Sequence, residues 1–204
     1  MIQVGVDPVS AGLITSLARP GGNVTGFTNL NIELGRKRFE ILREVVPTAT
    51  HFALLVNPTS PLISQSITSE IRAFAQSLGI NLSVLEASNE RSFEEVSTFL
   101  SRVRPGGLMI APDAFFISRS EQLAALSVRH LLPAITQFRE FSAAGGLMSY
   151  GGSFTEAAHE VGVYTGRILR GEKASDLPFR QLTKVELVAS VPLSLLGRAD
   201  EVIE

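Results

Sequence analysis

The chain has 204 residues, of which 45% are hydrophobic and 19% charged, a balance that is typical of a globular protein and not of a disordered one. Its formal net charge of −2 offers no basic field for a nucleic-acid backbone, so we expect no nucleic-acid partner. The lack of cysteine excludes disulfides, thiolate metal sites and a cysteine nucleophile. No apolar run approaches the roughly 20 residues that a membrane span needs.

The first part of the chain predicts a short set of elements. A strand is expected at Ile2–Val6, a short helix at Val9–Leu17, an extended segment at Asn23–Phe27 and an amphipathic helix at Asn31–Val46. The first residues lack the basic n-region of a signal peptide. The chain is therefore expected to stay in the cytoplasm if Met1 is its natural start.

The central stretch follows a repeated strand–loop–helix pattern. Phe52–Val56 is a nearly continuous apolar run, and apolar residues at helical spacing follow over about Ser60–Leu78. The pattern returns with a strand at Leu108–Ala111 and a helix at Ser118–His130. Strands and helices alternate throughout Phe52–Tyr150. The sequence therefore predicts an α/β fold with a parallel sheet and right-handed crossovers.

The other predicted elements continue this alternation. They are strands at Asn81–Leu85, Leu132–Thr136, Gly146–Tyr150 and Leu182–Ser190, and helices at Ser92–Arg102, Glu140–Ala144, Phe154–Leu169 and Leu195–Ile203. Ser92 with Glu95 three residues later predicts a capping box at the start of its helix. Gly79 suits the position after a helix end. The glycine pairs at 21–22 and 151–152 bracket the central block and are candidate hinges.

The sequence contains few patterns that indicate catalysis. His51, His130 and His159 do not have metal-ligand spacing, and neither a P-loop nor a G-x-G-x-x-G nor a G-x-S-x-G pattern occurs. We expect no metal, no cofactor and no enzyme activity. The weakest alternative is an α/β enzyme in which Asp7 and Asp113, both after apolar strands, form a carboxylate pair across a cleft.

Polar and aromatic residues after two of the strands predict a binding site. Ligands collect at the carboxyl ends of strands in an open α/β sheet, where Asn57 and Ser60 offer donors and acceptors beside a helix N-terminus that favours an anion. Asp113 suits an ammonium group, and Phe115 and Phe116 suit an apolar body. Together they predict a small amphipathic ligand such as an amino acid. The alternative is that the polar residues only shape turns and N-caps while the two phenylalanines fill the core.

Several motifs resemble one protein family. The segment G-V-D-P-V-S-A-G-L-I-T-S-L-A-R-P-G-G-N-V-T-G-F at 5–27 resembles ABC-transporter substrate-binding proteins of the tryptophan/tyrosine type. Further motifs look like the same family in the same order, namely L-L-V-N-P-T-S-P (54–61), A-P-D-A-F-F (111–116), F-R-E-F-S-A-A-G-G-L-M-S-Y-G (138–151), I-L-R-G-E-K-A-S-D-L-P (168–178) and L-L-G-R-A-D-E-V-I-E (195–204). The resemblance covers essentially the whole chain.

The resemblance implies a type I periplasmic-binding fold, in which two α/β lobes joined by crossing strands close on a small ligand. It implies a periplasmic solute-binding component of an ABC importer, with an ABC permease as partner and no catalytic residue. Asp7 then faces the cleft from the first lobe, and Asn57, Ser60 and Asp113 face it from the second. The resemblance and the side chains at 113, 115 and 116 jointly suggest an aromatic or branched amino acid as ligand. A cytoplasmic small-molecule sensor of the same fold is the alternative.

The chain departs from the family pattern at its start. Family members normally have a signal peptide and most of the first lobe before the G-D-P-V segment. We therefore expect an N-terminally truncated chain, with residues 1–26 as a remnant of the first lobe, 27–150 as a complete second lobe and 151–204 as a return to the first lobe. Unpartnered apolar faces mark interfaces, so a homodimer through Ile2–Leu17 and Phe154–Leu169 is expected.

Overall fold

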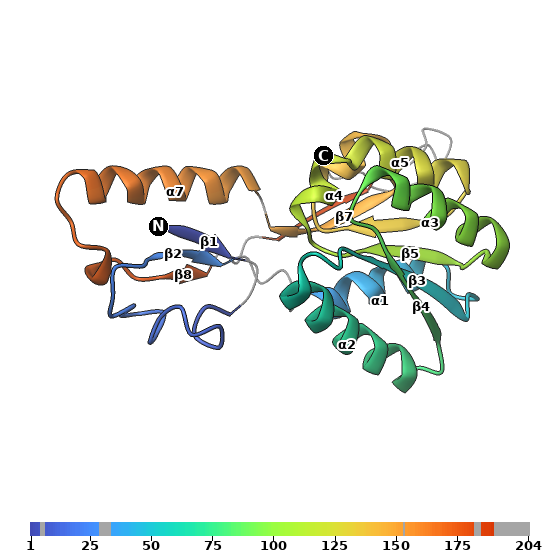
Figure 1. Ribbon diagram of the computed structural model, residues 1–204, viewed down its shortest axis with the longest axis horizontal. Coiled ribbons are helices and arrows are strands. Elements are labelled where there is room, and N and C mark those ends of the chain that lie inside the picture. The colour runs from blue at the N-terminus through green and yellow to red at the C-terminus, as the bar shows by residue number, and fades with distance from the viewer. Residues whose placement is uncertain (5–6, 29–33, 153, 182–184, 190–204) are drawn as a thin grey trace, which may run out of the picture.

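The computed structural model describes residues 1–4, 7–28, 34–152, 154–181 and 185–189. The described strands form a three-stranded sheet in the order β1-β2-β8 and a six-stranded sheet in the order β4-β3-β5-β6-β7-β9. Figure 1 shows the two sheets in two units, each with its own helices, which we call the smaller and the larger unit. The chain passes between the units after β2, after β7 and after β8.

The larger unit is a parallel sheet with one antiparallel edge strand. Its strands are β3 (His51–Val56), β4 (Asn81–Glu86), β5 (Gly107–Ile110), β6 (Ala134–Thr136), β7 (Met148–Gly152) and β9 (Val185–Ala189). Its helices are α1 (Gly35–Val45), α2 (Pro61–Ser77), α3 (Glu90–Val103), α4 (Ala114–Ser118), α5 (Ser120–Arg129) and α6 (Arg139–Ala143). Neighbours from β4 to β7 pair in parallel, and β9 pairs antiparallel with β7. The predicted parallel α/β arrangement is confirmed.

Helices cover both faces of this sheet, as Figure 1 shows for α1 and α2 on one side and α3 and α5 on the other. Side chains of β3 alternate between two apolar clusters. Phe52 and Leu54 pack with residues of α1 and α2, whereas Ala53 and Leu55 pack with residues of α3 to α6. Burial on both faces explains why the sequence of β3 is apolar at nearly every position.

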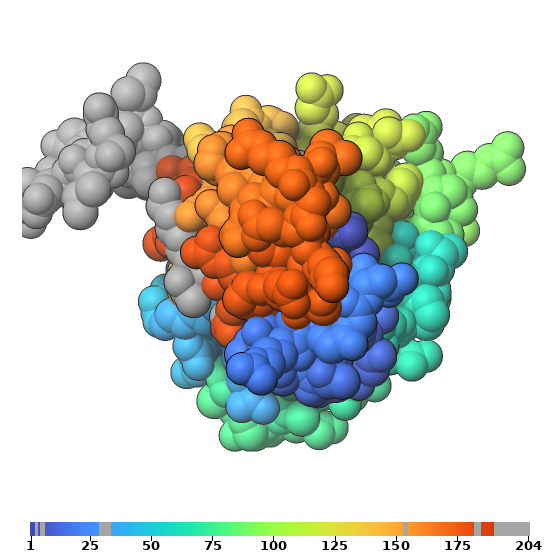
Figure 2. All heavy atoms as spheres, turned by 90° about the vertical axis from the view of Figure 1, so that its left-hand side faces the viewer, coloured from blue at the N-terminus to red at the C-terminus, as the bar shows by residue number. Residues whose placement is uncertain are grey.

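The smaller unit is built from segments that lie far apart in the sequence. It contains β1 (Ile2–Val4), β2 (Gly26–Thr28), β8 (Arg180–Gln181), the helix α7 (Phe154–Leu169) and the 3₁₀ helix η1 (Ala174–Asp176). Its core joins Phe27, Tyr164 and Leu177, and the first two rings have centroids 4.8 Å apart. The Tyr164 hydroxyl donates to the Pro178 carbonyl at 3.1 Å. Figure 2 shows the orange α7 and β8 region directly against the blue N-terminal segment.

Two predictions of local structure near strand ends are wrong. The expected helix at Val9–Leu17 is a set of turns, and Gly12 has a φ of +70°, which an α-helix does not accommodate. The predicted strand–loop–helix pattern leaves a loop between the strand at Leu108–Ala111 and the helix at Ser118–His130, but α4 begins there at Ala114. The Asp113 side chain accepts a hydrogen bond from the Phe115 N–H and so caps this helix.

Several predicted boundaries also change. Helix α3 begins at Glu90 without the expected Ser92 capping box, because the Asn89 side chain accepts the Ser92 N–H at 3.1 Å. The expected helix at Ser118–His130 is α5, which begins at Ser120 directly after α4. Gly79 lies where the sequence placed it, after the end of α2, and its φ is +68°. The expected terminal helix at Leu195–Ile203 lies outside the described residues.

None of the helices in the described ranges combines the length and the apolar character that crossing a bilayer requires.

Two leucines on adjacent elements test the packing of the larger unit. Leu54 of β3 is completely buried, whereas Leu62 of α2 is 64% exposed. We expect Leu54→Ala to lower the free energy of unfolding by about 2–5 kcal/mol, because it leaves a cavity in the core. Leu62→Ala, the matched control, should change it by less than about 0.5 kcal/mol. Urea unfolding measures both, and equal effects would contradict this packing.

Candidate functional site

Three of the predicted site residues meet at the carboxyl ends of two neighbouring strands. Asn57 follows β3, Ser60 precedes α2, and Asp113 lies just beyond β5. The Asn57 side-chain amide donates to Asp113 Oδ1 at 2.9 Å, and the Ser60 hydroxyl donates to Asp113 Oδ2 at 2.7 Å. The structure therefore brings these side chains together at the edge of the sheet where ligands bind in open α/β folds.

The hydrogen-bonding capacity of this network is largely used within the protein. Asp113 Oδ1 also accepts the Phe115 N–H at 2.9 Å. Asn57 Oδ1 accepts the backbone N–H and the hydroxyl of Thr59 at 3.0 and 2.8 Å. Asn57 is only 6% exposed. The network thus holds the two loops in fixed positions, and the Ser60 hydroxyl keeps acceptor capacity for another group.

The two predicted aromatic residues pack against the protein. Phe116 is buried in the cluster under α5. The ring of Phe115 stacks on Phe93 of α3 with centroids 5.6 Å apart, and the guanidinium of Arg119 lies 5.8 Å from its centroid. These contacts fit the alternative in which both rings serve packing, and a role in ligand binding stays a prediction.

Asp7 lies in the smaller unit, in the turn after β1. It is exposed, and it accepts hydrogen bonds from the Ser10 hydroxyl at 2.6 Å and from the Val9 N–H at 3.0 Å. These hydrogen bonds lower the pKa of Asp7 below its ordinary value, and the bond from the Ser10 hydroxyl has a larger effect than the bond from the Val9 N–H. Its hydrogen bonds within the described residues stay in its own loop, so it is not part of the network around Asp113.

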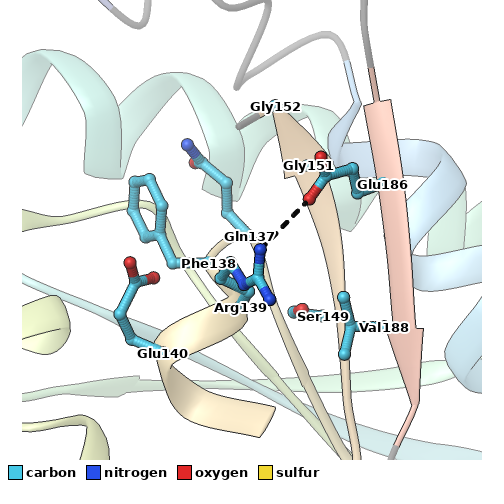
Figure 3. A pocket seen from close by; sticks show the side chains of 9 residues that line it. All are labelled: Gln137, Phe138, Arg139, Glu140, Ser149, Gly151, Gly152, Glu186 and Val188. Atoms are coloured by element: carbon cyan, nitrogen blue, oxygen red, sulfur yellow. Dashed lines mark ion pairs between the residues drawn. The ribbon is translucent and has the colours of Figure 1, made fainter. Parts of the chain in front are cut away.

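A hollow of about 10 Å³ lies beside this network, where β7 leaves the larger unit (Figure 3). Its lining residues come from the end of β6, from α6 and from the paired strands β7 and β9, and they are Gln137, Phe138, Arg139, Glu140, Ser149, Gly151, Gly152, Glu186 and Val188. The guanidinium of Arg139 lies 4.0 Å from the carboxylate of Glu186. We call this hollow the hinge-side pocket.

The sequence patterns did not indicate a role for Gln137, which lines this pocket. It follows β6 directly and is 2% exposed, and among the residues that the structure describes neither atom of its side-chain amide has a hydrogen-bond partner. A Cβ on Gly151 would lie 2.4 Å from the Gln137 carbonyl oxygen, so only glycine fits opposite it. Gln137 follows a third parallel strand, β6, and this position could have predicted from the sequence that it lies at the same edge as Asn57 and Asp113.

Gln137 also connects the pocket to the predicted site. A second hollow of about 10 Å³ is lined by Gln137 and Phe138 together with Asp113, Phe116 and residues packed around them. A larger hollow of about 740 Å³ opens near Arg104 and Leu131, at the amino ends of the strands. We place the candidate site at the carboxyl edge because open α/β sheets bind ligands there.

The buried guanidinium of Arg38 contacts β7, one of the strands of this sheet. Arg38 of α1 is fully buried, and its guanidinium donates to the Tyr150 carbonyl of β7 at 3.3 Å. Burial lowers the pKa of Arg38 to about 10, which still leaves the group protonated at neutral pH. No group of three or more histidine or acidic side chains with metal-binding geometry occurs in the part of the chain that the structure describes.

Residues 1–192 match the family model of ABC transporter substrate binding proteins. The chain belongs to this family. It has the α/β type I periplasmic-binding fold that the motifs implied, so the resemblance seen in the sequence is confirmed.

Three proteins that this chain resembles share 19% to 26% sequence identity with it. A tyrosine-binding protein from Clostridioides difficile (strain R20291) is 26% identical over 184 residues, which cover 89% of this chain and 52% of the relative. The ABC domain from Streptococcus pneumonia, solved in complex with L-Trp, has a TM-score of 0.75 and 21% identity over 97% of this chain and 69% of that one. A conserved domain protein from Vibrio cholerae has a TM-score of 0.73 and 19% identity over 95% and 68%. The chain spans about half the length of the tyrosine-binding relative.

Removing the central carboxylate tests the polar network. Asp113→Ala deprives the Asn57 amide, the Ser60 hydroxyl and the Phe115 N–H of their acceptor. We expect a loss of about 1–3 kcal/mol in the free energy of unfolding, because these donors lose their acceptor and Asn57 is buried. The control is Asp176→Ala, an exposed aspartate, for which we expect less than about 0.5 kcal/mol. Chemical denaturation measures both, and equal stability of the Asp113 variant and the wild type would rule out this role.

Proposed function

We propose that this protein is the solute-binding component of an ABC importer and holds a small amino acid ligand between its two units without chemical conversion. The observation that carries the proposal is the match to the substrate-binding family over residues 1–192. The polar network around Asp113 at the carboxyl edge of the larger sheet supports it, because that edge is where ligands bind in this type of fold.

The proposed ligand is an aromatic amino acid, with a branched one as the next candidate. Support comes from the relative named for tyrosine binding, and the related fold solved with L-Trp agrees with it. The helix α2 begins beside Ser60, and its free N–H groups suit the carboxylate of such a ligand.

The proposed site combines both units. Asp7 contributes from the smaller unit, and Asn57, Ser60 and Asp113 contribute from the larger one. Phe115 and Phe116 support the apolar part of the ligand through the packing of α4. The division expected from the sequence assigns 1–26 and 151–204 to the first lobe and 27–150 to the second. In the structure, Phe27 packs in the core of the smaller unit and β9 pairs with β7 of the larger one. The proposed location is the periplasm, and the proposed partner is an ABC permease.

Self-association is a further part of the proposal. In the described residues the smaller unit contains three strands, the long helix α7 and the short η1. Four apolar side chains on its segments are each at least 40% exposed, namely Val9, Leu13, Val163 and Leu169. We propose that a second copy covers these residues through Ile2–Leu17 and Phe154–Leu169.

Ligand binding is tested by thermal unfolding of the purified protein with L-tyrosine, L-tryptophan and L-leucine, and with glucose as a control compound. A ligand present at ~100 times its dissociation constant should stabilise the fold by about 2.7 kcal/mol, which raises the melting temperature. Aromatic amino acids should give the largest rise and glucose none. If no amino acid raises the melting temperature, the proposed function is wrong.

Self-association is tested by light scattering at micromolar concentration. The expected mass is twice that of the 21.9 kDa chain. Leu13→Glu and Leu169→Glu place a charge in the proposed interface and should give the single-chain mass, whereas Leu62→Glu on the larger unit should not. A wild-type monomer would contradict the proposal.

A further inference from the structure

Within the described residues, the side-chain amide of Gln137 is buried without a hydrogen bond. Gln137 is 2% exposed, and neither Oε1 nor Nε2 has a partner in this part of the chain. Buried polar groups in proteins are nearly always hydrogen-bonded, because an unsatisfied one carries its full desolvation cost. An unsatisfied buried amide in the ligand-free fold is expected of a side chain that forms its hydrogen bonds with a ligand.

The location of Gln137 matches that role. It lies at the carboxyl edge of the sheet, and its backbone contacts Gly151, which is next to the point where β7 leaves the larger unit. In Figure 3 its side chain reaches into the hinge-side pocket beside the ring of Phe138. It also lines the neighbouring hollow that contains Asp113. Gln137 therefore lies between the polar network around Asp113 and the point where β7 leaves the larger unit.

The charges around Gln137 define the chemistry that the pocket accepts. Arg139 and Glu186 face each other, and their charges offset one another. Glu140 is the additional carboxylate of the lining, and its buried Oε2 has no hydrogen bond to the described part of the chain. The unpartnered atoms are thus two acceptors, Gln137 Oε1 and Glu140 Oε2, and one donor, Gln137 Nε2.

We infer that Gln137 and Glu140 determine specificity for the head group of an α-amino acid. The ligand ammonium donates to Gln137 Oε1 and Glu140 Oε2, and a ligand carboxylate oxygen accepts from Gln137 Nε2. The hinge-side pocket, at about 10 Å³, has about the room of one water-sized group such as an ammonium. This inference rests on the proposed function and names the part of the ligand that these residues recognise.

The test compares binding of L-tyrosine, L-tryptophan and L-leucine by isothermal titration calorimetry in matched variants. Gln137→Met keeps the size of the side chain and removes both polar atoms. Gln137→Glu keeps an acceptor and removes the donor. Gln122→Met, on the exposed face of α5, is the control. We expect both Gln137 variants to lose at least tenfold in affinity and the control to lose less than twofold.

Glu140→Gln tests the charge separately. It should weaken L-tyrosine binding at least tenfold but leave binding of 3-(4-hydroxyphenyl)propionate, which lacks the ammonium, within twofold. Ligand-free Gln137→Met should melt no lower than the wild type, because it removes an unsatisfied buried amide.

The possible results separate the inference from the proposed function. If the wild type binds an amino acid and Gln137→Met binds it within twofold, the inference is overturned and the proposed function stands. A lower melting temperature of ligand-free Gln137→Met with unchanged affinity also overturns it, because the amide then serves the fold through a bound water molecule. If the wild type binds none of the three amino acids, the proposed function fails and the inference fails with it.

Discussion

The arrangement of the larger unit depends on one constraint, the burial of a parallel central strand on both faces. Strand β3 pairs in parallel with β4 and β5, and its side chains enter apolar clusters on both sides of the sheet. A parallel neighbour requires a crossover, and the crossover helices supply the cover. As a result, the carboxyl ends of β3, β5 and β6 lie along one edge, which brings Asn57, Asp113 and Gln137 to the same side of the molecule.

Polar groups on that edge fall into two classes that differ in how well they are satisfied. Asp113 accepts hydrogen bonds from Asn57, Ser60 and the Phe115 N–H, so its carboxylate stabilises two loops and a helix start. Gln137 lies one strand further along and is buried with no hydrogen-bond partner among the described residues. The first class gives the edge a fixed shape, and the second leaves it with hydrogen-bonding capacity for a ligand.

The two units depend on strands that cross between them. Strand β7 leads out of the larger sheet and β9 returns to pair with it, so that Gly151 lies opposite Glu186. Arg38 donates to the Tyr150 carbonyl in β7 and fastens this strand to α1. In the smaller unit, Phe27 and Tyr164 join segments from both ends of the chain. The Gln137 carbonyl faces Gly151, so Gln137 lies where this strand pair leaves the larger sheet.

The sequence by itself determined the elements whose signals are local. The apolar run of β3, the helical spacing of α2 and the turn at Gly79 each depend on neighbours within a few residues, and the family motifs are likewise read along the chain. The residues that cap helices show that local signals do not fix where a helix begins. Asp113 follows a strand and seemed to begin a loop, yet its hydrogen bond to the Phe115 N–H begins α4. Asn89 starts α3 in place of the predicted Ser92.

Only the tertiary structure decided which polar groups are satisfied. The sequence placed Asn57, Ser60 and Asp113 at strand ends, but their mutual hydrogen bonds depend on the pairing of β3 with β5 across 53 and 56 residues. The short pairing of β8 with β2, and with it the smaller sheet, likewise depends on distant segments. The unpartnered state of Gln137 is a property of the side chains that surround it in space. No pattern along the chain carries that information, because burial and hydrogen bonding are defined only once the sheet has formed.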